Sequence, residues 1–170
     1  MDKFTLLSIA LLHELAGQDT ALPDDAHAHI HLVNLARERL PAHLGGGSID
    51  FRSGDMLAPE LGCFDHVVAM DSVIHYRTED AVAALSRLAL RTSGSMVFTF
   101  APRTPLLATM IAVGRLFPRG NRAPFIEPVG EKTLARLIHA HPGLDGWRTA
   151  RSLRVSSSFY KSQALELVRT

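Results

Sequence analysis

Short apolar runs alternate along the chain with longer stretches whose hydrophobic positions follow helical spacing. Residues 48–52, 64–70 and 94–101 predict β-strands, and the apolar, β-rich centre of the third is typical of a strand buried on both faces. Two further runs, GWRTARSLRVSS and YKSQALELVR, predict strands joined around residues 157–159. The pattern thus places strands in the middle and at the end of the chain.

Helical spacing predicts helices over residues 30–40, 79–90, 105–116 and 131–141. Pro41 ends the first, Thr78 is expected to cap the second, and Pro142 ends the last. The run FTLLSIALLHELAG at residues 4–17 predicts an amphipathic or buried helix. It is shorter than a membrane span of about 20 residues, and it lacks the basic region of a signal peptide. A targeting segment is the alternative.

The order of these elements implies the fold class. Strands separated by helices form a parallel α/β sheet, and the two adjacent strands at the end of the chain form an antiparallel hairpin at one edge. No internal repeat or long linker divides the sequence, and 170 residues suit one domain with a buried core. We therefore predict a single α/β sheet domain.

Composition narrows the function classes and the compartment. A formal net charge of +1 gives no reason to expect nucleic-acid binding, and membrane association is expected to be peripheral at most. The single cysteine, Cys63, excludes an internal disulfide and predicts a cytoplasmic location, with peripheral contact to the inner membrane as the alternative. The alternating histidines His27, His29 and His31 are weak evidence for a transition-metal site, so no metal is predicted.

Polar residues follow the predicted strands where each strand ends. The segments are Gly54-Asp55-Met56, Met70-Asp71-Ser72 and Ala101-Pro102-Arg103. Ligands of an open parallel sheet bind beyond the carboxyl ends of its strands. His75 and Tyr76 come shortly after the second segment. We therefore predict a ligand crevice at this edge, with these residues around it.

Several stretches of the sequence carry a family resemblance. They read ARERLP, IDFRSGDM, FDHVVAMDSVIHYRTEDAV, GSMVFTFAPRTPLLATM, LFPRG and RVSSSFYKSQALELVR. From about Leu32 to the C-terminus the chain resembles the magnesium-protoporphyrin IX O-methyltransferases, which are class I S-adenosylmethionine-dependent enzymes. MDSVIHY and SSSFYKSQALE are not general methyltransferase features, which favours this family over a generic small-molecule methyltransferase.

The resemblance implies a Rossmann-like methyltransferase sheet with a C-terminal antiparallel hairpin, lacking its first strand or strands. It implies O-methylation of a propionate of magnesium protoporphyrin IX, a step of bacteriochlorophyll and chlorophyll synthesis. The methyl donor would be S-adenosylmethionine, and the products would be the monomethyl ester and S-adenosylhomocysteine. A magnesium chelatase subunit is the candidate protein partner.

The resemblance also assigns residues to the cofactor. The predicted cofactor-binding residues are Gly54, Asp55, Met56, Met70, Asp71 and Ser72. Asp55 would accept a hydrogen bond from the adenine amino group, and Met56 would pack on the ring. Asp71 would accept from the ammonium of the methionine part. The alternatives are that Asp55 is an ordinary turn acid and that Asp71 caps a turn or a helix.

The remaining assignments concern the substrate. A propionate is already ionised at neutral pH, because the pKa of a carboxyl is about 4, so no strong base is required. His75 is the predicted catalytic residue and would orient the carboxylate for in-line attack or ligate the substrate's magnesium. Tyr76, Arg103 and Arg115 are the predicted substrate contacts. The alternatives are a turn-capping histidine and solvated arginines.

The first 31 residues stand outside the resemblance. No Gly-x-Gly precedes Leu32, where a DxGCGxG turn is expected, and HAHIH stands where an acid should hold the ribose hydroxyls. We divide the chain into an atypical segment, 1–31, and a methyltransferase C-terminal domain, 32–170, and interpret the former as unrelated sequence from a truncated, frame-shifted or mis-started gene product. The alternative function is therefore an inactive remnant, or a module that binds a porphyrin or a pathway partner, with weak S-adenosylmethionine binding.

Overall fold

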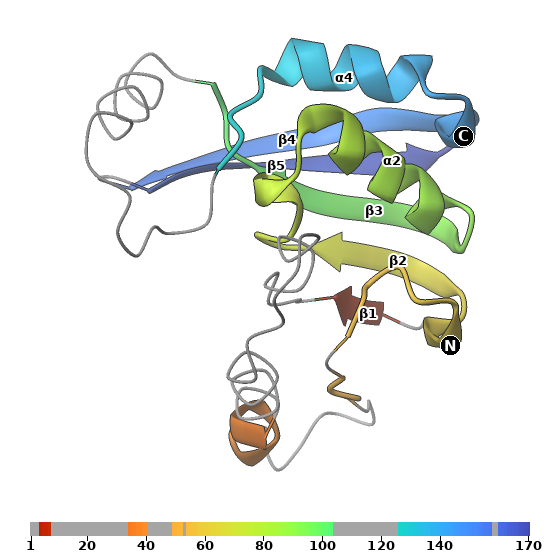
Figure 1. The fold of residues 1–170 in the computed structure, drawn as a ribbon, viewed down its shortest axis with the longest axis vertical. Helices are drawn as coiled ribbons and strands as arrows, with labels where there is room; N and C mark the ends of the chain where they lie inside the picture. Colours follow the sequence, from red (N-terminus) through yellow and green to blue (C-terminus); the bar gives the residue numbers. More distant parts are fainter. Residues whose placement is uncertain (1–3, 8–33, 41–48, 53, 104–125, 158–159) are drawn as a thin grey trace, which may run out of the picture.

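The structure is a computed structural model that describes residues 4–7, 34–40, 49–52, 54–103, 126–157 and 160–170 (Figure 1). These residues contain one five-stranded sheet with the strand order β1-β2-β3-β5-β4. The strands are β1 Phe4–Leu7, β2 Phe64–Ala69, β3 Thr92–Phe100, β4 Trp147–Ser157 and β5 Tyr160–Arg169.

Strand direction changes once across the sheet. β2 pairs in parallel with both β1 and β3, whereas β5 pairs antiparallel with β3 and with the edge strand β4. The predicted fold class, a parallel α/β sheet closed by an antiparallel hairpin, is therefore confirmed. The strands predicted over residues 64–70 and 94–101 and the two at the end of the chain are all present, with ends that differ by a residue or two.

Two predictions for the first third of the chain are wrong. Residues 4–7, expected in a helix, form β1. A short apolar run suits either structure, and pairing with β2 gives its backbone groups partners. Residues 49–52, expected in a strand, form no regular element. Some of their polar groups bond to side chains instead, with Arg37 donating to the Phe51 carbonyl at 2.9 Å and Arg52 to the Asp50 carboxylate at 2.7 Å.

Two helices cover one face of the sheet (Figure 1). They are α2, Thr78–Ala89, and α4, Glu131–Ala140, and they contact each other as well as the strands beneath them. Thr78 is the first residue of α2 and makes no cap, since Arg77 holds the N-cap position. Residues 34–38 are helical, as predicted within 30–40, while the helix predicted over 105–116 lies outside the described residues.

The core lies between the two helices and the sheet. α2 contributes Leu85 and Leu88, α4 contributes Leu134 and Ile138, and the strands contribute Val67, Met96, Phe98, Leu165 and Leu167, all nearly or fully buried. The alternate residues of β3, Ser95, Val97 and Thr99, are only partly buried. The prediction that this strand is buried on both faces is therefore wrong, because the described helices cover only one face.

Leu88 and Leu90 offer a matched test of this packing. Leu88 is 0% exposed and Leu90 is 80% exposed, two residues apart at the end of α2. Leu88→Ala should lower the free energy of unfolding by about 2–5 kcal/mol, because it leaves a cavity in the core. Leu90→Ala should change it by less than about 0.5 kcal/mol. Urea unfolding followed by circular dichroism measures both, and equal effects would contradict the packing described.

Candidate functional site

The carboxyl ends of β1, β2 and β3 lie at the same edge of the sheet, because the three strands run parallel (Figure 1). The register aligns Leu7 with Ala69 and Ala69 with Phe98, so the strands end side by side. This is the edge at which ligands of open α/β sheets bind. The polar segments after β2 and β3 are therefore candidate site residues on structural grounds also.

The turn after β2 has an unusual backbone. Asp71 has a φ angle of 51°, in the left-handed region that few residues other than glycine occupy. Its N–H donates to Thr99 Oγ1 at 2.7 Å, and the Thr99 hydroxyl donates to Asp71 Oδ1 at 3.0 Å. Ser72 is fully buried and its hydroxyl donates to the Met70 carbonyl at 3.1 Å. Met70 and Asp71 are exposed at the edge. The buried Ser72 stabilises the turn through its bond to Met70.

His75 and Tyr76 follow directly on this turn. The short 3-10 helix η2, Val73–His75, carries His75, and the Tyr76 N–H donates to the Val73 carbonyl at 3.2 Å. Both side chains are half-buried, and Tyr76 packs against the core. The structure therefore brings His75 and Tyr76 to the same edge as Asp71.

The segment 126–130 crosses this edge from η2 to the end of β3. The Glu127 N–H donates to the Ile74 carbonyl at 3.1 Å. Val129 donates to Ala101 and accepts from Arg103, each at 3.0 Å. Arg103 is exposed beyond β3, at the predicted edge. Arg115 lies outside the described residues.

The segment predicted to hold adenine makes several hydrogen bonds within the protein. Asp55 Oδ1 accepts from the Leu57 N–H at 2.8 Å, so the carboxylate caps its own turn. Arg91, the residue before β3, donates to the carbonyls of Ala58 at 2.7 Å and Met56 at 3.2 Å. These bonds join the carbonyls of residues 56 and 58 to the side chain of the residue that precedes β3. The Met56 side chain is 3% exposed and belongs to the core.

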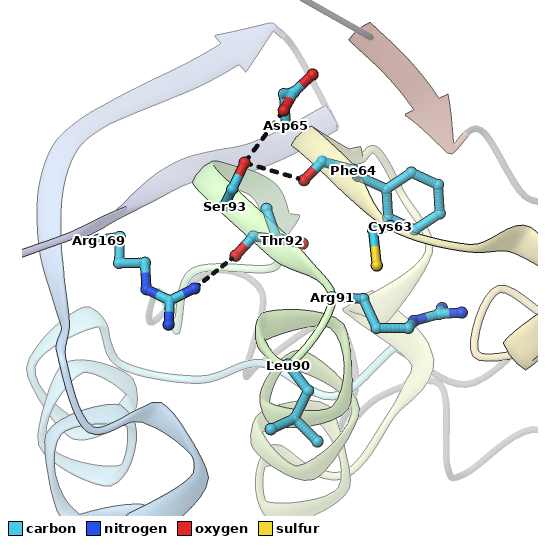
Figure 2. A pocket seen from close by; sticks show the side chains of 8 residues that line it. All are labelled: Cys63, Phe64, Asp65, Leu90, Arg91, Thr92, Ser93 and Arg169. Carbon is cyan, nitrogen blue, oxygen red and sulfur yellow. Dashed lines mark hydrogen bonds between the residues drawn. The ribbon is translucent and has the colours of Figure 1, made fainter.

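An open depression of about 500 Å³ lies at the amino ends of β2 and β3 (Figure 2). Its lining residues are Cys63, Phe64, Asp65, Leu90, Arg91, Thr92, Ser93 and Arg169. Several of its polar groups bond to one another. The Ser93 hydroxyl donates to Asp65 at 3.1 Å, and Arg169 donates to the Thr92 carbonyl at 3.2 Å (Figure 2). This depression is therefore distinct from the edge that holds Asp71 and His75.

A buried amide joins α4 to the hairpin near the end of β3. Gln163 is 3% exposed, lies opposite Phe100, and donates from Nε2 to Glu131 and to Ser152, each at 2.7 Å. Arg154 donates to Gln163 Oε1 at 2.8 and 3.1 Å. Hydrogen bonds from Gln163 and then Ser152 hold the pKa of Glu131 below its ordinary value, with the charge of Arg154 adding to them. None of these residues, nor Thr99, is among the site residues predicted from the sequence.

Among the described residues, no group of three or more His, Cys, Asp or Glu side chains could hold a metal ion. His27, His29 and His31 lie outside that part of the chain. No helix within the described ranges is long and apolar enough to cross a membrane.

A family profile and two curated relatives match this chain, and all three point to the same family. A family profile described as Magnesium-protoporphyrin IX methyltransferase C-terminus matches residues 69–169. The magnesium-protoporphyrin O-methyltransferase of Rhodobacter capsulatus is 43% identical over 79% of this chain and 57% of its own length. That of Synechocystis sp. is 33% identical over 67% of this chain and 48% of its own length. The chain thus spans about half the length of the curated relatives it matches.

A solved structure agrees with these sequence matches. The crystal structure of magnesium protoporphyrin IX methyltransferase from Synechocystis PCC 6803 with bound SAH superposes with a TM-score of 0.63. It is 32% identical, and the match covers 81% of this chain and 59% of that chain. The described sheet and helices therefore follow the architecture of that enzyme.

The Glu131 network makes stability depend on pH. Because the folded-state pKa of Glu131 is lowered from 4.5, its contribution is fully present above about pH 4.5 and is lost as the pH falls through the folded value. Glu131→Gln removes this contribution. The difference in urea stability between the wild type and Glu131→Gln should therefore be largest near neutral pH and shrink in acid.

The matched control is Glu60→Gln, which changes an exposed carboxylate outside this network. A stability difference for Glu131→Gln that stays constant from about pH 6 to about pH 3 would contradict the assignment.

Proposed function

The chain belongs to the magnesium-protoporphyrin IX methyltransferase family and corresponds to its C-terminal part. On this premise we propose that it methylates a propionate of magnesium protoporphyrin IX, with S-adenosylmethionine as the donor. The observation that carries the proposal is the turn after β2. It presents Asp71, His75 and Tyr76 within six residues at the carboxyl edge of a parallel sheet, inside the matched range 69–169.

The donor's methionine part fits the chemistry of this turn. Its ammonium needs an anionic acceptor, and the exposed carboxylate of Asp71 offers one where nucleotide ligands bind. When bound, the donor supplies an electrophilic methyl group on a sulfonium. The adenine assignment to Asp55 stays a prediction, and it would require the Asp55 carboxylate to serve both its own turn and the ligand.

The reaction needs orientation more than proton transfer. A carboxylate oxygen of the propionate forms a bond to the methyl carbon while the bond from that carbon to sulfur breaks. The electron pair stays on sulfur, and a neutral ester and a thioether result. No proton moves, since the propionate is ionised at neutral pH. His75 would hold the carboxylate in line with the methyl group. A positioned side chain lowers the activation barrier in this way, because the reacting atoms are already aligned.

Tyr76 and Arg103 are proposed as further substrate contacts. Arg103 is exposed beyond the end of β3, and a guanidinium there can form paired hydrogen bonds with a carboxylate. Arg115 is proposed for the same role from the family resemblance alone. A magnesium chelatase subunit as partner, and a cytoplasmic location with at most peripheral membrane contact, rest on that resemblance and on the single cysteine.

The direct test is incubation of the purified chain with magnesium protoporphyrin IX and S-adenosylmethionine, with chromatography of the pigment. Formation of the monomethyl ester supports the proposal. Binding of the porphyrin without ester identifies a binding module, the alternative that the sequence raised. If the chain neither forms the ester nor binds the porphyrin, both the enzyme and the binding-module hypotheses are overturned.

Substitution of His75 tests its role in turnover. His75→Ala should lower the rate of ester formation by about a hundredfold, because the carboxylate loses its orientation, and should change donor affinity less. His75→Gln should keep part of the rate, since an amide can still donate a hydrogen bond. Single-turnover rates and titration calorimetry measure the two effects separately.

His139→Gln is the matched control, because that histidine is exposed on α4, away from the η2 turn. A His75→Gln variant as slow as His75→Ala would point to proton transfer or metal ligation instead of orientation.

A further inference from the structure

The left-handed backbone of Asp71 needs a specific restraint. A residue with a side chain at φ 51° carries steric strain, although aspartate tolerates this region better than most residues. Such conformations persist where surrounding contacts fix them, and they gather at ligand sites. Asp71 is the one residue other than glycine with positive φ among the described residues. The question is therefore what holds it there.

Thr99 supplies that restraint with one hydroxyl group. Its Oγ1 accepts the Asp71 N–H at 2.7 Å and donates to Asp71 Oδ1 at 3.0 Å, so both the backbone and the carboxylate are fixed. Thr99 comes from the neighbouring strand β3, between the buried residues Phe98 and Phe100. It therefore points away from the helix-covered face, and the parallel register Ala69↔Phe98 brings it beside the turn.

We propose that Thr99 is a positioning residue that holds the Asp71 carboxylate in place for the ammonium of the methyl donor. This inference rests on the proposed function. A carboxylate has about four lone-pair sites, so it can accept from Thr99 and from a ligand together. The hydroxyl fixes the rotation of the carboxylate before the ligand arrives, which reduces the ordering cost of binding.

The test is Thr99→Val in the full 170-residue chain, because valine is close to threonine in shape and lacks the hydroxyl. Thr99→Ser, which keeps the hydroxyl, is the matched control. Amide hydrogen exchange by NMR reports the Asp71 N–H bond, and NMR titration with S-adenosylhomocysteine reports affinity even when binding is weak. In Thr99→Val we expect faster exchange of the Asp71 amide and about a tenfold higher dissociation constant. Thr99→Ser should stay near the wild type in both.

A double-mutant cycle separates positioning from a purely structural role. If Thr99 acts through the Asp71 carboxylate, Thr99→Val should leave the dissociation constant unchanged in an Asp71→Ala background. An equal loss of affinity in both backgrounds overturns the inference, as does an unchanged exchange rate of the Asp71 amide in Thr99→Val. A wild type that binds S-adenosylhomocysteine, with Thr99→Val binding equally well, overturns this inference alone. A wild type that does not bind at all overturns the proposed function as well.

Discussion

Parallel pairing of β2 with β3 is the constraint on which the rest of the described structure depends. Parallel neighbours cannot be joined by a tight turn, so the chain crosses over through α2 before it returns as β3. The crossover brings Leu85 and Leu88 onto the buried side chains of the sheet. It also leaves both strands ending at the same edge, which is where the turn after β2 meets Thr99.

The hairpin of β4 and β5 completes the sheet and fixes the region beside this edge. β5 runs antiparallel to β3 and places Gln163 opposite Phe100. Its buried amide bonds to Glu131 at the start of α4 and to Ser152 on β4, so one side chain links three elements. An unpaired amide at this depth would be costly, so the network ties the first residue of α4 to the hairpin. Segment 126–130 then has a defined path from η2 to α4.

The polar groups at the two ends of β2 and β3 differ in character. At the amino ends of β2 and β3, Arg91 and Arg169 bond to backbone carbonyls and lie over the rings of Phe64 and Trp147, a structural arrangement. At the carboxyl ends, a strained backbone carries an exposed carboxylate, with a histidine four residues further along. Strain beside exposed polar groups is typical of a ligand site. This contrast agrees with the proposal that a ligand binds at the carboxyl edge.

The sequence by itself determined the final four strands and both described long helices, because the hydrophobic residues of each element follow its period. The order of these elements then determined the fold class. The sequence also identified the family and the turn that holds Asp71 and His75. Only the tertiary structure decided that residues 4–7 pair as a strand and that residues 49–52 do not. The physical reason is that short segments take the structure their neighbours offer. Thr99 could not be found from the sequence either, because its 28-residue separation from Asp71 is closed only by strand pairing.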